Sequence, residues 1–254
     1  MEISKATPLR LILRVRPLAV QVLEEAAGHH CWACLDQNLQ DFCRDRGLEA
    51  SGLEEAISAL APVPADSDWK AKPIYYLIDY LTANHRRFRE KDLPALGRLL
   101  DVHGVPTFPD RYAFELMSQE FLAFEQELLK HMQEEEEFLF PKIMRNEACF
   151  RYREMTPEPY RGSVNLFLTL QPHKQEEEIK HMFMGIREKL RNLRVQEGTR
   201  ALLDKANAAL EAFQVALVTH ADLETQVLFP VAGRLEQELY ENSAPGMFRF
   251  PGDQ

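Results

Sequence analysis

Two stretches of the chain carry the same pattern of residues. They are His131-Met-Gln-Glu-Glu-Glu-Glu-Phe-Leu-Phe-Pro141 and His220-Ala-Asp-Leu-Glu-Thr-Gln-Val-Leu-Phe-Pro230, which share His, Glu, Leu, Phe and Pro at offsets 0, 4, 8, 9 and 10. Four residues turn an α-helix by about 400°, so the His and the Glu of each copy lie on one face, about 6 Å apart. A single pair of this kind is usually an exposed helix pair, but its duplication favours a metal site.

The sequence around this repeat predicts an all-α protein. Long stretches place apolar residues three and four positions apart, whereas the apolar-polar alternation of a half-buried strand is scarce. We expect Pro94 to bend or restart the first long helix, Pro141 to end the second and Pro230 to interrupt the fourth. The connection over 145–169 is aperiodic. The expected helices cover 73–90, 110–140, 172–193 and 199–228, with a further segment at 234–240.

The first and third of these helices each hold one His that fits an inward position, His85 and His181. Two helical hairpins would then face each other in a four-helix bundle, and bundle cores are known places for metal sites. The combined set exceeds the four ligands of a tetrahedral zinc ion and suits two metal ions. Imidazole and carboxylate accept Fe, Zn or Mn, so the ligand types leave the metal open. The candidate ligands are His85, His131, Glu135, His181, His220 and Glu224.

The first sixty residues predict short helices. Asn38 caps one that ends at Gly47, and Ser51 with Glu54 three positions later predicts a capping box before the next. A polar stretch with two prolines at 61–68 is typical of a linker. We therefore expect a small helical Cys-containing domain over 1–63, a four-helix bundle over 69–240 and a flexible tail over 241–254.

Several motifs within residues 69–240 match one family of proteins. They are Leu77-Ile-Asp-Tyr-Leu-Thr-Ala-Asn-His85, Val102-His-Gly104, His131-Met-Gln-Glu-Glu135, Lys180-His-Met-Phe-Met-Gly185 and the stretch from His220 to Pro230, which is the most specific. The region resembles hemerythrin-like di-iron domains, and among them most closely the repair-of-iron-centres proteins of the bacterial cytoplasm. The resemblance implies two non-haem iron ions, with His85 and His131 on one and His181 and His220 on the other. It also implies that Glu135 and Glu224 bridge them.

The resemblance gives two further residues accessory roles. His103 matches the family's Val-His-Gly, which implies an accessory or entry-channel role. The oxygen-carrying hemerythrins add another His one turn before the ligand of the third helix, and Glu177 holds that place here. This departure argues against a simple oxygen carrier.

The N-terminal residues resemble the small Cys-containing domain that precedes the bundle in this family. The stretch from Leu39 to Leu48 fits its second helix, but Cys31-Trp-Ala-Cys34 stands where the family has two adjacent cysteines. A lone Cys-x-x-Cys can be a redox pair, half of a metal site or two packed thiols. Cys31 and Cys34 are therefore accessory candidates, whereas Cys43 and Cys149 are expected to be buried thiols.

The resemblance implies a function in the repair of iron-sulfur clusters damaged by nitrosative or oxidative stress, by donation of iron. The implied partners are damaged iron-sulfur proteins, with nitric oxide or oxygen as small ligands. Two alternatives need the same ligands, a di-iron sensor or carrier of these gases and a nitric oxide reductase. The sequence has no phosphate-binding loop, dinucleotide fingerprint or nucleophile elbow, so nucleotide and hydrolase chemistry have no support.

The composition of the chain excludes some classes of binding partner. The 254 residues carry 30 Lys and Arg against 40 Asp and Glu, a formal charge of -10 that opposes binding to nucleic acid. No stretch approaches the roughly 20 consecutive apolar residues that cross a bilayer. With no secretion signal and four cysteines, the sequence favours a reducing cytoplasm. The sequence does not decide whether the chain forms a homodimer.

Overall fold

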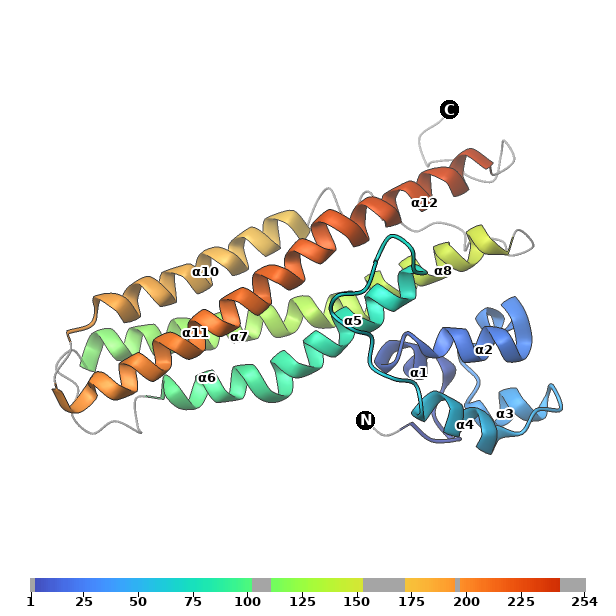
Figure 1. Cartoon of the computed structure of the whole chain (residues 1–254), viewed down its shortest axis with the longest axis horizontal. Coiled ribbons are helices and arrows are strands. Elements are labelled where there is room, and N and C mark those ends of the chain that lie inside the picture. The colour runs from blue at the N-terminus through green and yellow to red at the C-terminus, as the bar shows by residue number, and fades with distance from the viewer. Residues whose placement is uncertain (1–2, 102–110, 153–171, 195–196, 243–254) are drawn as a thin grey trace, which may run out of the picture. The chain divides into compact units, whose positions relative to one another are not determined.

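The computed structural model describes residues 3–101, 111–152, 172–194 and 197–242 (Figure 1). Regular structure within these ranges is helical, apart from an isolated bridge between Pro8 and Asn38, so the expected all-α fold is confirmed. None of the described helices is both long and apolar enough to cross a membrane. In chain order the elements are α1 (Leu9–Val15), α2 (Ala19–Ala27), the 3-10 helix η1 (Gly28–Ala33), α3 (Leu39–Arg44), α4 (Ala50–Ser58), α5 (Ile74–Arg87), the π-helical turn η2 (Phe88–Asp92), α6 (Leu93–Leu99), α7 (Arg111–Glu134), the π-helical turn η4 (Glu135–Leu139), α8 (Phe140–Arg151), α10 (Pro172–Asn192), α11 (Glu197–Leu223), the π-helical turn η5 (Glu224–Leu228) and α12 (Phe229–Asn242).

The chain forms two compact units. The first comprises Met1–Ala83, Glu135–Phe167 and Thr225–Gln254, and the second comprises Asn84–Glu134 and Leu168–Glu224. The first unit therefore combines α1 to α4 with α8 and α12, which the sequence assigns to separate domains. The predicted domain boundaries stay a prediction. Of the expected tail, residues 241–242 belong to α12, and the rest lies outside the described residues.

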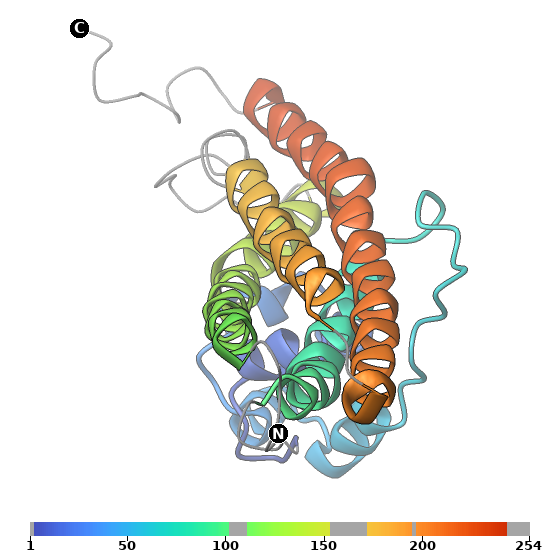
Figure 2. The same cartoon turned by 90° about the vertical axis from the view of Figure 1, so that its left-hand side faces the viewer.

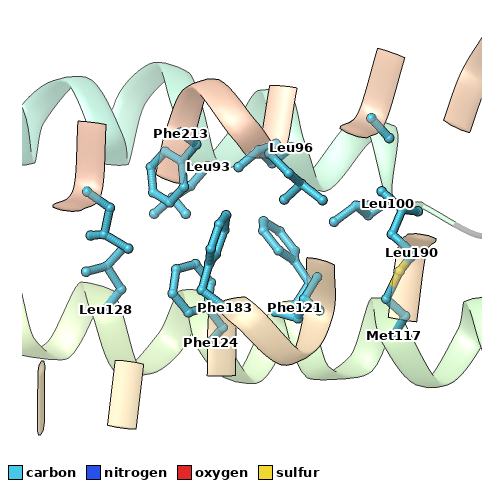
Figure 3. Packing of buried hydrophobic residues seen from close by; sticks show 14 of the residues in the cluster. Leu93, Leu96, Leu100, Met117, Phe121, Phe124, Leu128, Phe183, Leu190 and Phe213 are labelled. Atoms are coloured by element: carbon cyan, nitrogen blue, oxygen red, sulfur yellow. The ribbon is translucent and has the colours of Figure 1, made fainter. Parts of the chain in front are cut away.

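In the second unit, α6, α7, α10 and α11 pack side by side as a four-helix bundle, which Figure 2 views from its end. Three rings from three of these helices, Phe124, Phe183 and Phe213, form the centre of the core, with ring centroids 5.1 to 6.3 Å apart (Figure 3). Phe88 adds a fourth ring, 5.2 Å from Phe213. The rings are tilted or edge-on, as aromatic pairs prefer. The periodic apolar residues of the sequence thus form this core.

In the first unit, buried polar contacts join α5 to its neighbours. Arg16 donates a hydrogen bond to Oδ2 of Asp79 at 2.8 Å, and Oδ1 of Asp79 accepts one from the backbone N–H of Leu18 at 3.1 Å. Glu147 of α8 accepts a bond of 2.7 Å from the backbone N–H of Ile74, the first residue of α5. This bond satisfies one of the N–H groups that a helix leaves unbonded at its start. Burial raises the pKa of Glu147.

The prolines do not end helices. The expectation that the second long helix stops at Pro141 is wrong, because the chain continues through η4 into α8 as far as Arg151. A proline inside a helix lacks an N–H, and its ring crowds the carbonyl four residues earlier. The π-helical turn, whose hydrogen bonds span five residues, widens the helix just before the proline and relieves this crowding. Pro94 and Pro230 also stand two positions after the end of a π-helical turn.

The N-terminal cap predictions have two outcomes. Asn38 caps α3 as expected, because its Oδ1 accepts a hydrogen bond from the backbone N–H of Asp41 at 2.8 Å. The capping box at Ser51 is wrong, because α4 begins at Ala50. The hydroxyl of Ser51 instead accepts a hydrogen bond of 2.6 Å from Nζ of Lys5, so a contact distant in sequence replaces the local cap.

The aromatic core yields a stability prediction. Replacing Phe124 by Ala should lower the free energy of unfolding by about 3 to 5 kcal/mol, because it removes a fully buried ring and leaves a cavity. Tyr112→Ala on the same helix is the matched control, since Tyr112 is 74% exposed and its loss should change the free energy by less than about 0.5 kcal/mol. Denaturant unfolding measures both. Equal losses would contradict the packing described for this core.

Candidate metal centre

Three side chains of the second unit meet inside the bundle. His85 comes from the last turn of α5, His220 from the last turn of α11, and Glu224 is the first residue of η5. Nε2 of His85 lies 2.9 Å from Nε2 of His220, which in turn lies 3.0 Å from Oε1 of Glu224. All three residues are buried, with no more than 5% of their surface exposed. His220 and Glu224 thus meet as the sequence repeat predicts.

Glu135, which directly follows the last residue of α7, completes a group of four. Ligand atoms of His85, Glu135, His220 and Glu224 all lie within 4.8 Å of one another. Burial of two carboxylates this close together costs much free energy unless their charge is compensated. A divalent cation gives that compensation, and iron, zinc and manganese all accept imidazole and carboxylate ligands. The chemistry of the donor set therefore fits a metal ion.

Both carboxylates occupy the same position in their local structure. Glu135 is the first residue of η4, and Glu224 is the first residue of η5. Single π-helical turns within longer helices are frequent at functional sites, because the widened turn changes the direction of its side chains. The repeat seen in the sequence is therefore also a repeat of backbone conformation.

His131 is buried and lies beside this group. It lines a cavity of about 20 Å³ in the second unit, together with His220 and Glu224. The rest of the lining is largely apolar and includes Phe88 and Leu217. This volume holds about one water-sized molecule. The structure thus brings His131 close to two of the candidate ligands, although it is outside the group of four.

His181 takes a different position. It is exposed on α10, and its Nδ1 lies 3.2 Å from the backbone carbonyl oxygen of Glu177. The Glu177 carboxylate accepts a hydrogen bond of 3.3 Å from Nζ of Lys180. The structure does not bring His181 or Glu177 into the group of four, and their roles stay predictions. His103 lies outside the described residues.

Two further side chains lie beside the site and were not predicted from the sequence. Phe88 packs edge-on against the ring of His220, with centroids 5.6 Å apart, and Lys180 lines the cavity. In the sequence, Phe88 lies about one turn after His85, and Lys180 lies directly before His181. Only this closeness to candidate ligands could have indicated them. Glu136, the next residue after Glu135, is also buried, with 7% of its surface exposed.

The cysteines have unequal surroundings. Burial, with a further effect of Glu24, raises the pKa of the Cys31 thiol to about 12. Cys34 is partly exposed, and its Sγ accepts a hydrogen bond from Nη2 of Arg46 at 3.0 Å. Cys43 and Cys149 are buried, as expected, and none of the four cysteines forms a disulfide. The two accessory candidates therefore differ in chemistry.

Comparison with known proteins adds a second kind of observation. No family model matches the chain. The chain is 28% identical over 206 residues to proteins named iron-sulfur cluster repair protein YtfE from Yersinia pseudotuberculosis serotype IB (strain PB1/+) and Yersinia pestis (strain Pestoides F). Each match covers 79% of this chain and 85% of the relative. The matches agree with the family that the His-x-x-x-Glu repeat indicates. Over most of its length the chain is therefore similar to the iron-sulfur cluster repair protein YtfE, which agrees with the resemblance to the repair-of-iron-centres proteins.

Proposed function

We propose that this chain is a non-haem di-iron protein of the cytoplasm that assists the repair of iron-sulfur clusters damaged by nitrosative or oxidative stress, by donating iron. The observation that carries the proposal is the buried group of His85, Glu135, His220 and Glu224, whose ligand atoms lie within 4.8 Å of one another. The relatives are named iron-sulfur cluster repair proteins, which supports the same function.

The proposed ligand set adds His131 and His181 to the group of four. The buried imidazoles would bind through neutral ring nitrogens, and the two carboxylates would balance the positive charge of the ions inside the bundle. When bound, the two ions would be a store of redox-active iron for transfer to a client protein. His181 is exposed, whereas His85 and His131 are buried. An exposed ligand exchanges readily with water, which suits a site that releases its metal.

The proposed clients are iron-sulfur proteins that have lost iron or whose clusters nitric oxide or peroxide has attacked. The decisive experiment inactivates an iron-sulfur enzyme with nitric oxide and follows the recovery of its activity. The iron-loaded chain should restore activity faster than an equal amount of free ferrous iron. Recovery no faster than with free iron would contradict iron donation and favour a sensor.

The cavity favours a second candidate function. Its size matches a diatomic molecule, its lining is largely apolar, and His131, His220 and Glu224 all reach it. Nitric oxide and oxygen are small and weakly polar, so an apolar cavity beside the ligands can admit them. The chain would then bind or reduce one of these gases at the same site.

The proposed iron site predicts which carboxylates matter. Purified from iron-replete medium, the chain should hold two irons, and Glu135→Gln or Glu224→Gln should lose at least half of that metal. Each change keeps the size of the side chain but removes its charge. Asp222→Asn is the matched control, since Asp222 lies two residues before Glu224 but is exposed, and it should keep its metal. Metal analysis decides, and equal loss in Asp222→Asn, or zinc in the unaltered chain, would contradict the proposal.

The cavity gives a further prediction. Leu217→Phe should fill space beside the ligands and slow the binding of nitric oxide to the iron-loaded chain, as stopped-flow absorption would show. Leu203→Phe is the control, because Leu203 is buried on the same helix but does not line the cavity. Both changes overpack the core, at a cost of about 1 to 3 kcal/mol. If both variants bind nitric oxide equally fast, the gas neither passes through the cavity nor binds in it.

A further inference from the structure

The turn that holds Cys31 and Cys34 lies far along the chain from the metal ligands and has a chemistry of its own. Cys31 lies within the 3-10 helix η1, and Cys34 is the residue that ends it. The backbone N–H of Cys34 donates to the carbonyl of Cys31 at 3.1 Å. In a 3-10 helix, side chains three positions apart lie one above the other, with Cα atoms about 6 Å apart. Disulfides join Cα atoms roughly 4.4 to 6.8 Å apart, so the backbone spacing of the two cysteines is compatible with a disulfide.

Arg46 distinguishes Cys34 from Cys31. Its Nη2 donates a hydrogen bond to Sγ of Cys34 at 3.0 Å, and its Nη1 donates to the backbone carbonyl of Phe42 at 3.3 Å. The guanidinium also lies over the ring of Phe42, 4.3 Å from its centroid. These contacts hold a permanent cation against one sulfur. Such a cation stabilises negative charge on the sulfur, which a thiol needs in order to act as a nucleophile.

The turn is also held from its other side. The indole N–H of Trp32, between the two cysteines, donates to Glu24 at 2.9 Å, and Arg151 of α8 donates to the same carboxylate at 2.6 Å. Arg145 of α8 donates to the backbone carbonyl of Trp32 at 3.4 Å. The turn is therefore fixed on both sides within the first unit, and the positions of its two sulfurs are set by the fold.

We propose that Cys34 is a redox-active thiol of this chain, that a hydroperoxide oxidises it, and that Cys31 then closes a disulfide with it. The thiolate of Cys34 attacks the hydroperoxide, so an S–O bond forms, the O–O bond breaks, and hydroxide or alkoxide leaves and takes up a proton. Cys34 becomes a sulfenic acid. The sulfur of Cys31 then attacks that of Cys34: the S–S bond forms, the S–O bond breaks, and water leaves with the proton of Cys31. One peroxide is reduced by two electrons, and two thiols are oxidised.

The two steps differ in speed. Cys34 is partly exposed and lies beside a cation, whereas Cys31 is buried and its thiol has a raised pKa. The attack of Cys31 is therefore slow, and the sulfenic acid persists long enough to be trapped by a dimedone-type reagent. This proposal stands apart from the iron site, because no candidate metal ligand takes part in it.

The first experiment measures alkylation by iodoacetamide on the full chain, residue by residue, by peptide mass mapping. Cys34 should react at least about tenfold faster than the three buried cysteines. Arg46→Gln should slow Cys34 roughly tenfold, as expected for loss of one charge-assisted hydrogen bond. Arg46→Lys keeps the cation and should restore part of the rate. Arg10→Gln, which removes an exposed arginine paired with Asp36 at 2.8 Å, should change nothing.

The second experiment adds hydrogen peroxide to the full chain. The chain is purified both with and without iron, so that oxidation driven by the metal can be distinguished from direct oxidation of Cys34 by the peroxide. The trap should label Cys34, and without the trap a Cys31–Cys34 disulfide should form. Cys31→Ser should keep the trappable form without the disulfide, and Cys34→Ser should give neither. Alkylation of Cys34 no faster than that of buried cysteines, or an unchanged rate in a folded Arg46→Gln variant, would overturn the proposal.

Discussion

Burial of two carboxylates and two imidazoles in one small space is the constraint on which the candidate site depends. Glu135 and Glu224 are 2% and 1% exposed, and their oxygens share that space with the ring nitrogens of His85 and His220. A helical bundle could bury apolar side chains there at no electrostatic cost. Removal of one partner from a buried charged group commonly destabilises by several kcal/mol, whereas apolar replacement of the whole group is often neutral. Stability alone therefore does not account for such a group, and metal binding does.

The local backbone serves this arrangement. Each carboxylate begins a π-helical turn, and each turn is followed by Phe and Pro at the start of the next α-helix. The proline makes a regular α-helix unfavourable at that point, so the widened turn is the form that keeps the helix continuous. Pro141 and Pro230 thus help to position Glu135 and Glu224, although they lie six residues further along the chain and outside the group.

The sequence predicts some of these features because they are local. The four-residue step from His220 to Glu224 is a property of one helix turn, and so is the cap at Asn38, and both appear in the structure. The continuation of the helix beyond Pro141 could not be predicted, because a proline more often ends a helix than follows a π-helical turn. The contact between Arg46 and Cys34 depends on how η1 and α3 pack, which the spacing of the residues does not encode.

Within the first unit, helix α8 connects η4, which begins with the candidate ligand Glu135, to the turn that holds Cys31 and Cys34. It begins directly after η4, whose first residue is Glu135, and it presents Arg145 and Arg151 to the turn that holds the thiols. Each residue added to or removed from η4 would rotate α8 by about 100° about its axis. Such a rotation would carry both arginines away from Trp32 and Glu24. The π-helical turn η4 sets the direction of Glu135, and it also sets which face of α8 contacts the turn that holds the thiols. The position of Glu135 and the orientation of α8 therefore both depend on the same five residues.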